Sequence, residues 1–169
     1  PVTTMIFHII TTFPNIFTSY LGDSILARAL KAGKIQVQFY NPRDFTTDKH
    51  HKTDDRPYSG GPGMVMYAMP ILAAVESAKH KVSKAQNSKQ TTNNKATKVP
   101  TFILSPAGEQ FTNAMAAKMA KKKEDIILIC GRYEGIDARV KKILSARGGS
   151  AFGGKAKEIS VGPYVLTGG

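Results

Sequence analysis

Short apolar runs alternate along the chain with segments of helical periodicity. Met5–Ile10, Thr101–Leu104 and Ile126–Cys130 are compact and rich in residues that favour strands, which is typical of buried strands. Ile35–Tyr40 alternates apolar and polar residues and predicts a strand with one covered face. Ile159–Leu166 predicts a last strand. Strands that alternate with helices indicate an α/β fold with a mainly parallel sheet.

The segments between these runs predict helices. Over Ser24–Ala32 the apolar positions share one face, Asp23 is placed to cap the first turn, and Gly33 ends the helix. Further helices are expected over Met64–Lys79, Phe111–Lys121 and Asp137–Leu144, with a short helical turn at Asn15–Tyr20.

Three segments lack a usable period. Asn41–Gly63 predicts a long loop, and long loops in compact domains are usually functional or disordered. Lys79–Lys98 carries six lysines and no acidic residue, and we interpret it as a flexible basic loop. Residues 145–157 are rich in glycine and are interpreted as a surface insertion. No internal repeat is visible.

Composition narrows the choice of function. The 169 residues suit one domain, residues 1–169, and 24 Lys and Arg against 12 Asp and Glu give a net charge of +12. That excess favours RNA or DNA as a partner first and an acidic membrane surface second. The single cysteine, Cys130, excludes a disulfide framework and a Cys-based zinc site within the chain. The apolar run at the start is too short to span a bilayer, so we expect a cytoplasmic protein without a membrane anchor.

Each predicted strand of the second half runs into a loop of small residues. These loops are Ser105–Gly108, Gly131–Asp137 and Tyr164–Gly169. Ligands of parallel α/β sheets bind outside the carboxyl ends of the strands, so the three loops predict one crevice for an adenosine-like ligand held by backbone groups. The plainer alternative, that each glycine only makes a turn, stays open. No GxGxxG or GxxxxGK[ST] spacing occurs, which disfavours a Rossmann site or a P-loop.

The loop 41–63 has two interpretations. A flap whose Arg56, Tyr58 and glycines close over a substrate is one, because Tyr and Arg stack on unpaired bases. A metal site is the other, and we disfavour it because the spacing fits no closed zinc pattern. Its ligands would come from Asp48, His50, His51, Asp54 and Asp55.

Several motifs together resemble a known family. They are Pro42–Thr46 (PRDFT), Asp54–Tyr58 (DDRPY), Gly60–Met64 (GGPGM), Leu104–Pro106 (LSP), Cys130–Asp137 (CGRYEGID) and Tyr164–Gly169 (YVLTGG). In this order they resemble the bacterial tRNA (guanine-N1-)-methyltransferases, which methylate guanine 37 beside the anticodon. The resemblance covers nearly the whole chain.

The resemblance implies more than the spacing does. It implies the SPOUT α/β fold, with helices on both faces of the sheet and a C-terminal trefoil knot, a homodimer, and S-adenosyl-L-methionine bound at the knot. Arg56, Tyr58, Gly60, Gly61 and Gly63 would border the target guanine. The donor contacts would include Leu104, Ser105, Pro106, Gly131, Glu134, Val161, Gly162, Pro163, Tyr164, Val165, Leu166, Gly168 and Gly169. No metal ligand is expected.

Methylation at guanine N1 requires a base, because that nitrogen carries a proton. In the family the base is an aspartate beyond the last motif, before a C-terminal tRNA-binding domain, and both would follow Gly169. We therefore expect the 169 residues alone to be inactive or feebly active, with no catalytic base among them and Glu134 in a supporting role. The alternative is a non-catalytic RNA-binding or dimerisation module.

Overall fold

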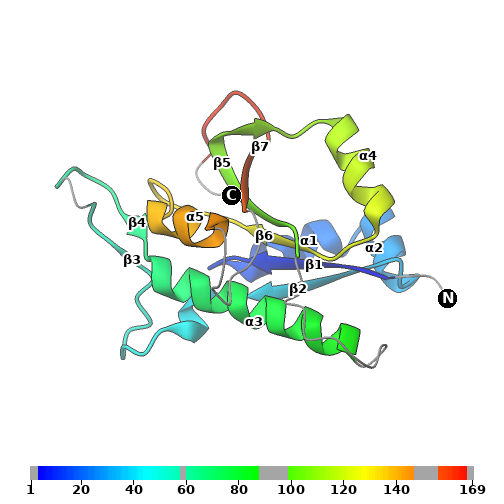
Figure 1. The fold of residues 1–169 in the computed structure, drawn as a ribbon, viewed down its shortest axis with the longest axis horizontal. Coiled ribbons are helices and arrows are strands. Elements are labelled where there is room, and N and C mark those ends of the chain that lie inside the picture. The colour runs from blue at the N-terminus through cyan, green and yellow to red at the C-terminus, as the bar shows by residue number, and fades with distance from the viewer. Residues whose placement is uncertain (1–3, 58–59, 88–98, 147–155, 167–169) are drawn as a thin grey trace.

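The computed structural model describes residues 4–57, 60–87, 99–146 and 156–166. A five-stranded sheet forms its centre, with the spatial order β2-β1-β6-β5-β7 and every neighbouring pair parallel (Figure 1). The predicted α/β class with a parallel sheet is therefore confirmed. The strands are β1 (Met5–Ile10), β2 (Ile35–Tyr40), β5 (Thr101–Gln110), β6 (Ile126–Ile129) and β7 (Lys157–Ser160).

Helices connect the strands, and α2, α4 and α5 begin at polar caps. Asp23, Thr112 and Asp137 each accept a backbone N–H of the first turn of the helix that follows. The helices are α1 (Thr18–Leu21), α2 (Ser24–Lys31), α3 (Ala68–Asn87), α4 (Asn113–Lys122) and α5 (Ala138–Ser145), with 3-10 turns η1 (Pro14–Phe17) and η2 (Pro42–Phe45).

Apolar side chains cover both faces of the sheet. Ile10, Ile127 and Ile129 point to one face and pack under α3 and α5. Phe7 and Leu128 point to the other, where the two methionines of α4 cover them. Figure 1 shows α3 and α4 on opposite sides of the sheet. Helices on both faces are thus confirmed, while the trefoil knot stays a prediction.

The predicted boundary between a helix and a basic loop at residue 79 is wrong. Helix α3 begins at Ala68 and continues to Asn87, well into the lysine-rich segment. Val75, Ala78 and Val82 extend its apolar stripe at helical spacing, and Val82 is 2% exposed. Lys79 is itself buried, at 7% exposure, and desolvation lowers the pKa of its ammonium group. Residues 88–98 lie outside the described residues.

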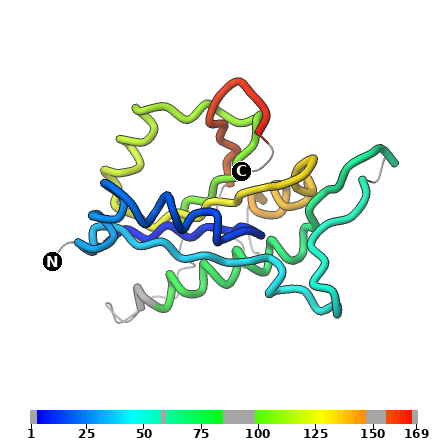
Figure 2. The backbone as a smooth tube through the Cα atoms, turned by 180° about the vertical axis from the view of Figure 1, so that it is seen from behind, coloured from blue at the N-terminus to red at the C-terminus, as the bar shows by residue number. Residues whose placement is uncertain are grey.

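The loop 41–63 contains more structure than its composition predicts. Its first residues form η2, and Asp54–Asp55 (β3) pairs antiparallel with Val65–Met66 (β4). Val65 and Met66 are therefore in a strand and not in the predicted helix. We call residues 54–57 and 60–66 the flap, which projects from the body of the protein in Figure 2.

Two strand boundaries also differ from the prediction. Strand β5 does not end at Leu104, because Leu104 and Glu109 both pair with Ile159 and the four residues between them bulge out. Strand β7 stops at Ser160 and does not reach Leu166. The Ser160 hydroxyl donates to the Gly162 carbonyl and accepts the Gly162 N–H, which turns the chain away from the sheet. Of the glycine-rich stretch, residues 147–155 lie outside the described residues.

Candidate active site

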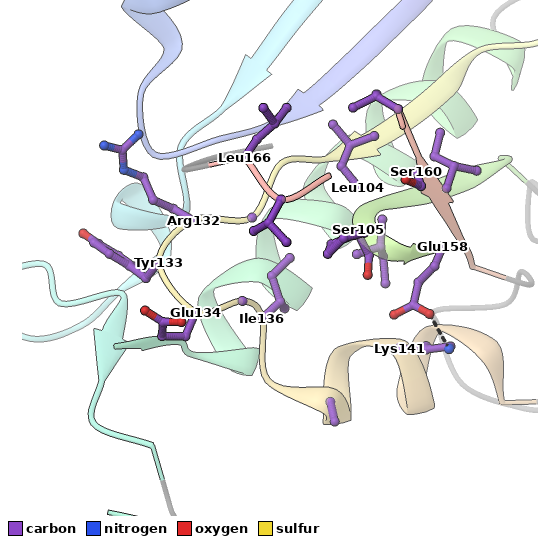
Figure 3. Close-up of a pocket in the computed structure, with 18 of the residues that line it drawn as sticks. Leu104, Ser105, Arg132, Tyr133, Glu134, Ile136, Lys141, Glu158, Ser160 and Leu166 are labelled. Carbon is purple, nitrogen blue, oxygen red and sulfur yellow. Dashed lines mark hydrogen bonds and ion pairs between the residues drawn. The ribbon is translucent and has the colours of Figure 1, made fainter. Parts of the chain in front are cut away.

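The topology brings three loops together at one edge of the sheet. Strands β6, β5 and β7 are neighbours, so their carboxyl ends open on the same side. A cavity of about 580 Å³ lies there, between the β5 bulge, the loop after β6 and the segment after β7 (Figure 3). The predicted residues that line it are Leu104, Ser105, Pro106, Gly131, Glu134, Val161, Tyr164, Val165 and Leu166.

Other predicted residues do not line the cavity. Gly162 and Pro163 belong to the turn after β7 and are absent from its wall. Arg56, Gly60 and Gly61 are exposed residues of the flap. Tyr58, Gly168 and Gly169 lie outside the described residues.

The walls are mainly apolar. Ile103 and Ile159 are buried beneath the cavity, and Val165 and Leu166 cover its other side although they are 81% and 56% exposed. A side chain at Gly131 would press on Ile136, since its Cβ would lie 3.1 Å from Cγ1. Exposed apolar side chains over a mainly apolar cavity suit a flat ring held by backbone hydrogen bonds.

Backbone hydrogen bonds fasten the flap to the loop after β6. The Glu134 N–H donates to the Met64 carbonyl at 3.0 Å, and the Met66 N–H donates to the Gly135 carbonyl at 3.0 Å. The Asp137 N–H in turn donates to the Met66 carbonyl at 3.1 Å. The base of the flap is therefore attached to the cavity wall. Tyr133 adopts φ 59°, a backbone conformation unusual for a residue with a side chain, within the same loop.

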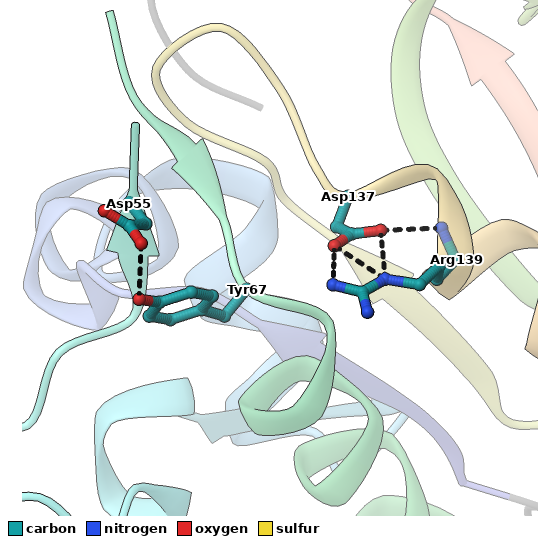
Figure 4. A network of polar contacts seen from close by, with 4 residues as sticks. All are labelled: Asp55, Tyr67, Asp137 and Arg139. Carbon is teal, nitrogen blue, oxygen red and sulfur yellow. Dashed lines mark hydrogen bonds and ion pairs between the residues drawn. The ribbon is translucent and has the colours of Figure 1, made fainter. Parts of the chain in front are cut away.

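Two carboxylates near this junction are held by neighbouring groups (Figure 4). Asp55 accepts hydrogen bonds from the Arg56 N–H and from the Tyr67 hydroxyl at 3.0 Å, and these bonds lower the pKa of Asp55. Asp137 is bound by the Arg139 guanidinium, whose hydrogen bonds lower the pKa of Asp137. Both carboxyl groups are therefore ionised at neutral pH and already bound by these neighbours.

Cys130 lies beside the cavity wall but is buried and inert. Desolvation raises the pKa of its thiol to about 11, so little thiolate forms at neutral pH. Within the described part of the chain, no group of three or more His, Cys, Asp or Glu side chains is arranged to hold a metal. In the same part of the chain, no helix is long and apolar enough to cross a membrane.

Sequence reasoning missed several lining residues. Lys141 of α5 and Glu158 of β7 form an ion pair at 2.6 Å on the cavity rim. Arg132 and Tyr133 also line the cavity; they belong to the predicted crevice loop Gly131–Asp137 but were not named among the donor contacts. No local sequence pattern indicates the ion pair, because Lys141 and Glu158 lie on different elements. Arg132 and Tyr133, in contrast, lie within the motif CGRYEGID.

Comparison with known proteins agrees with this geometry. Residues 5–169 match the family described as "tRNA (Guanine-1)-methyltransferase TrmD". A protein of Thermomicrobium roseum named tRNA (guanine-N(1)-)-methyltransferase is 48% identical over 98% of this chain and 53% of its own length. Proteins of the same name from Clostridioides difficile and Caldanaerobacter subterraneus are 44% and 41% identical, with 62% and 57% of their lengths covered. The chain therefore spans between about half and three fifths of the length of these curated relatives.

Proposed function

The chain belongs to the tRNA (guanine-1)-methyltransferase family, and on that premise we propose that its cavity binds S-adenosyl-L-methionine and serves methyl transfer to N1 of guanine 37 in tRNA. The observation that carries the proposal is the convergence of the three small-residue loops around one cavity. That tRNA is the substrate of the whole protein is part of the same proposal.

The lining suits this donor. The cavity volume of about 580 Å³ falls in the range of small-molecule sites. Ile103, Ile136 and Val165 would enclose the adenine ring, and the exposed backbone of the β5 bulge would hydrogen-bond its edge. The donor supplies an electrophilic methyl group on a sulfonium. The protein's task is to align that group with the guanine nitrogen and to exclude water.

The carboxylates of the lining have other tasks. Asp137 caps α5 and is engaged by Arg139, so it is a poor proton acceptor. Glu134 joins the loop after β6 to the flap through its backbone N–H, and its side chain lies against Gly63 of the flap, so we assign it a role in positioning that loop. Glu158 is paired with Lys141, and none of the three carboxylates is assigned as the base for the guanine N1 proton. We accordingly propose that the 169-residue chain methylates tRNA feebly or not at all.

The partners are proposed from charge and exposed apolar surface. A net charge of +12 favours a polyanion such as tRNA. Ile16, Tyr20 and Ile25 are each more than 60% exposed on η1, α1 and α2, which supports a homodimer that covers them. We also propose that the donor site lies at a trefoil knot and that the protein is located in the cytoplasm.

Calorimetry tests the donor site directly. The chain should bind S-adenosyl-L-methionine without tRNA, and Ser105→Trp, which fills the cavity mouth, should abolish the heat signal. The matched control is Ser83→Trp on α3, away from the cavity, which should bind the donor as the wild type does. A wild-type chain without donor binding at millimolar concentration would refute the proposed function.

The alternative is a non-catalytic RNA-binding or dimerisation module, which the net charge also supports. It predicts salt-sensitive tRNA binding together with no calorimetric signal for the donor. Incubation of labelled tRNA with the chain and the methyl donor measures turnover separately.

A further inference from the structure

Two arginines share one aromatic ring beside the cavity. The guanidinium carbon of Arg132 lies 4.5 Å from the centre of the Phe13 ring, and that of Arg43 lies 5.3 Å from it. The three residues come from the loop after β6, the loop after β1 and η2, and all three are half-buried. We call Phe13, Arg43 and Arg132 the arginine platform.

In the described part of the chain, the two guanidinium groups of the platform have no charged partner. Among the described residues, no carboxylate forms an ion pair with Arg43 or Arg132, and no acceptor takes a hydrogen bond from either guanidinium. Contact with the ring face offsets part of the cost of half-burying the charges. Contact with the ring does not satisfy the hydrogen-bond donors of the two planar guanidinium groups. Such a pair is suited to bind an anion with bidentate geometry.

The platform lies where the substrate would approach. Arg132 lines the cavity, and in Figure 3 its side chain extends from the loop after β6 toward the loop that follows β1. Arg43 does not line the cavity, so the platform continues outward from the donor site. An anion bound there would sit next to the cavity and outside it.

We propose that the arginine platform binds the phosphate backbone of the RNA beside the base that enters the active site. This inference rests on the proposed function and deepens it. The phosphate groups of a single-stranded loop are the anions that any guanine within an RNA brings with it. The donor's carboxylate is the competing anion, and the position of Arg43 outside the cavity disfavours it. Phe13 acts as a positioning residue that holds both guanidinium planes.

Binding of an RNA hairpin with guanine in its loop tests the proposal. Affinity is measured by fluorescence anisotropy over a range of salt concentrations for the wild type, Arg43→Gln, Arg132→Gln and Arg28→Gln. Arg28 is an exposed arginine of α2 and is the matched control for loss of one charge. Each platform change should weaken binding about tenfold and reduce the salt slope by roughly 0.7, the value for one phosphate contact on a single strand. Arg28→Gln should stay within about twofold of the wild type.

Conservative variants separate the platform's geometry from its charge. Arg43→Lys keeps the charge and should retain the salt slope while affinity falls, because an ammonium group lacks the planar fork. Phe13→Leu keeps an apolar side chain and should also weaken RNA binding, since both guanidiniums lose their platform. Circular dichroism and thermal unfolding verify that each variant is folded.

Two results would overturn the proposal. One is an RNA affinity and salt slope of both Gln variants equal to those of Arg28→Gln. The other is a loss of donor affinity in Arg43→Gln, which would assign the platform to the donor's carboxylate. Calorimetry of the wild type with S-adenosyl-L-methionine judges the proposed function independently, so the two failures are distinguishable.

Discussion

Gly63 lies against the side chain of Glu134, which leaves no room for a Cβ at Gly63 unless Glu134 moves. A Cβ at Gly63 would overlap Cγ of Glu134 and come within 3.0 Å of its carboxylate, and Gly63 has φ +99°. The flap and the cavity wall therefore meet at a position that requires glycine. Gly63→Ala should lower the free energy of unfolding by about 1–2 kcal/mol and weaken donor binding, because Glu134 must move. Urea unfolding and calorimetry measure the two effects.

Neighbouring glycines provide the controls for Gly63→Ala. A Cβ at Gly61 meets nothing within 4 Å, so Gly61→Ala should change stability by less than about 0.5 kcal/mol. Gly60 has open space but φ +74°, so Gly60→Ala isolates the backbone strain. If Gly63→Ala and Gly60→Ala have the same donor affinity, the contact between Gly63 and Glu134 plays no part in donor binding.

Gly108 lets the β5 bulge pack on β7. A Cβ at Gly108 would lie 2.5 Å from the Ile159 nitrogen, and this backbone obstacle cannot rotate away. Gly108→Ala should therefore cost about 2 kcal/mol or more and disturb the donor cavity. Gly162→Ala is the comparison. A Cβ at Gly162 would meet only the exposed Tyr164 ring, which can rotate away, so this variant should lose less than about 1 kcal/mol of stability. Equal thermal stability of the two variants would contradict this account.

Cys130 should make the fold sensitive to alkaline pH. Burial raises the pKa of its thiol from 9.0 to about 11. The unfolded chain releases this proton first, so the stability that the protonated thiol contributes is complete below pH 9 and is lost as pH rises to 11. Cys130→Ala should show a smaller loss of stability over that interval. At pH 8 iodoacetamide should alkylate the native thiol about a hundredfold more slowly than the unfolded one; equal rates would refute its burial.

Asp137 acts both as a helix cap and as the partner of Arg139. Asp137→Asn keeps a good cap and loses the ion pair, so it should cost about 0.5–1 kcal/mol at pH 7. Asp137→Ala loses the cap as well and should cost about 1 kcal/mol more. The pKa of Asp137 is lowered, so its stabilising contribution is present above pH 3.8 and disappears as pH falls through the folded value.

Unfolding in urea at a series of pH values tests the Asp137 prediction. The difference between wild type and Asp137→Asn should be constant from pH 7 to pH 5 and should narrow below about pH 4. A difference that persists undiminished in acid would show that the Arg139 pair is not its cause.

Local patterns were enough to predict much of the architecture. The runs Met5–Ile10 and Ile35–Tyr40 became the predicted parallel strands, because residue type and alternation are properties of adjacent positions. Asp23 caps its helix as its residue type indicates, since the cap and its backbone partner lie within one turn. The residues of the β5 bulge and of the loop after β6 were identifiable for the same reason, as small residues directly follow apolar runs.

Only the tertiary structure decided which distant residues meet. Helix α3 continues to Asn87 because Val82 finds a buried place under the sheet, which outweighs the polar composition around it. The β5 bulge exists because Leu104 and Glu109 both pair with one residue of β7. The platform of Phe13 and its arginines depends on β1 and β6 being neighbours in the sheet. Local sequence specifies the elements and their ends, whereas burial and strand order, which depend on residues far apart in the chain, assemble the site.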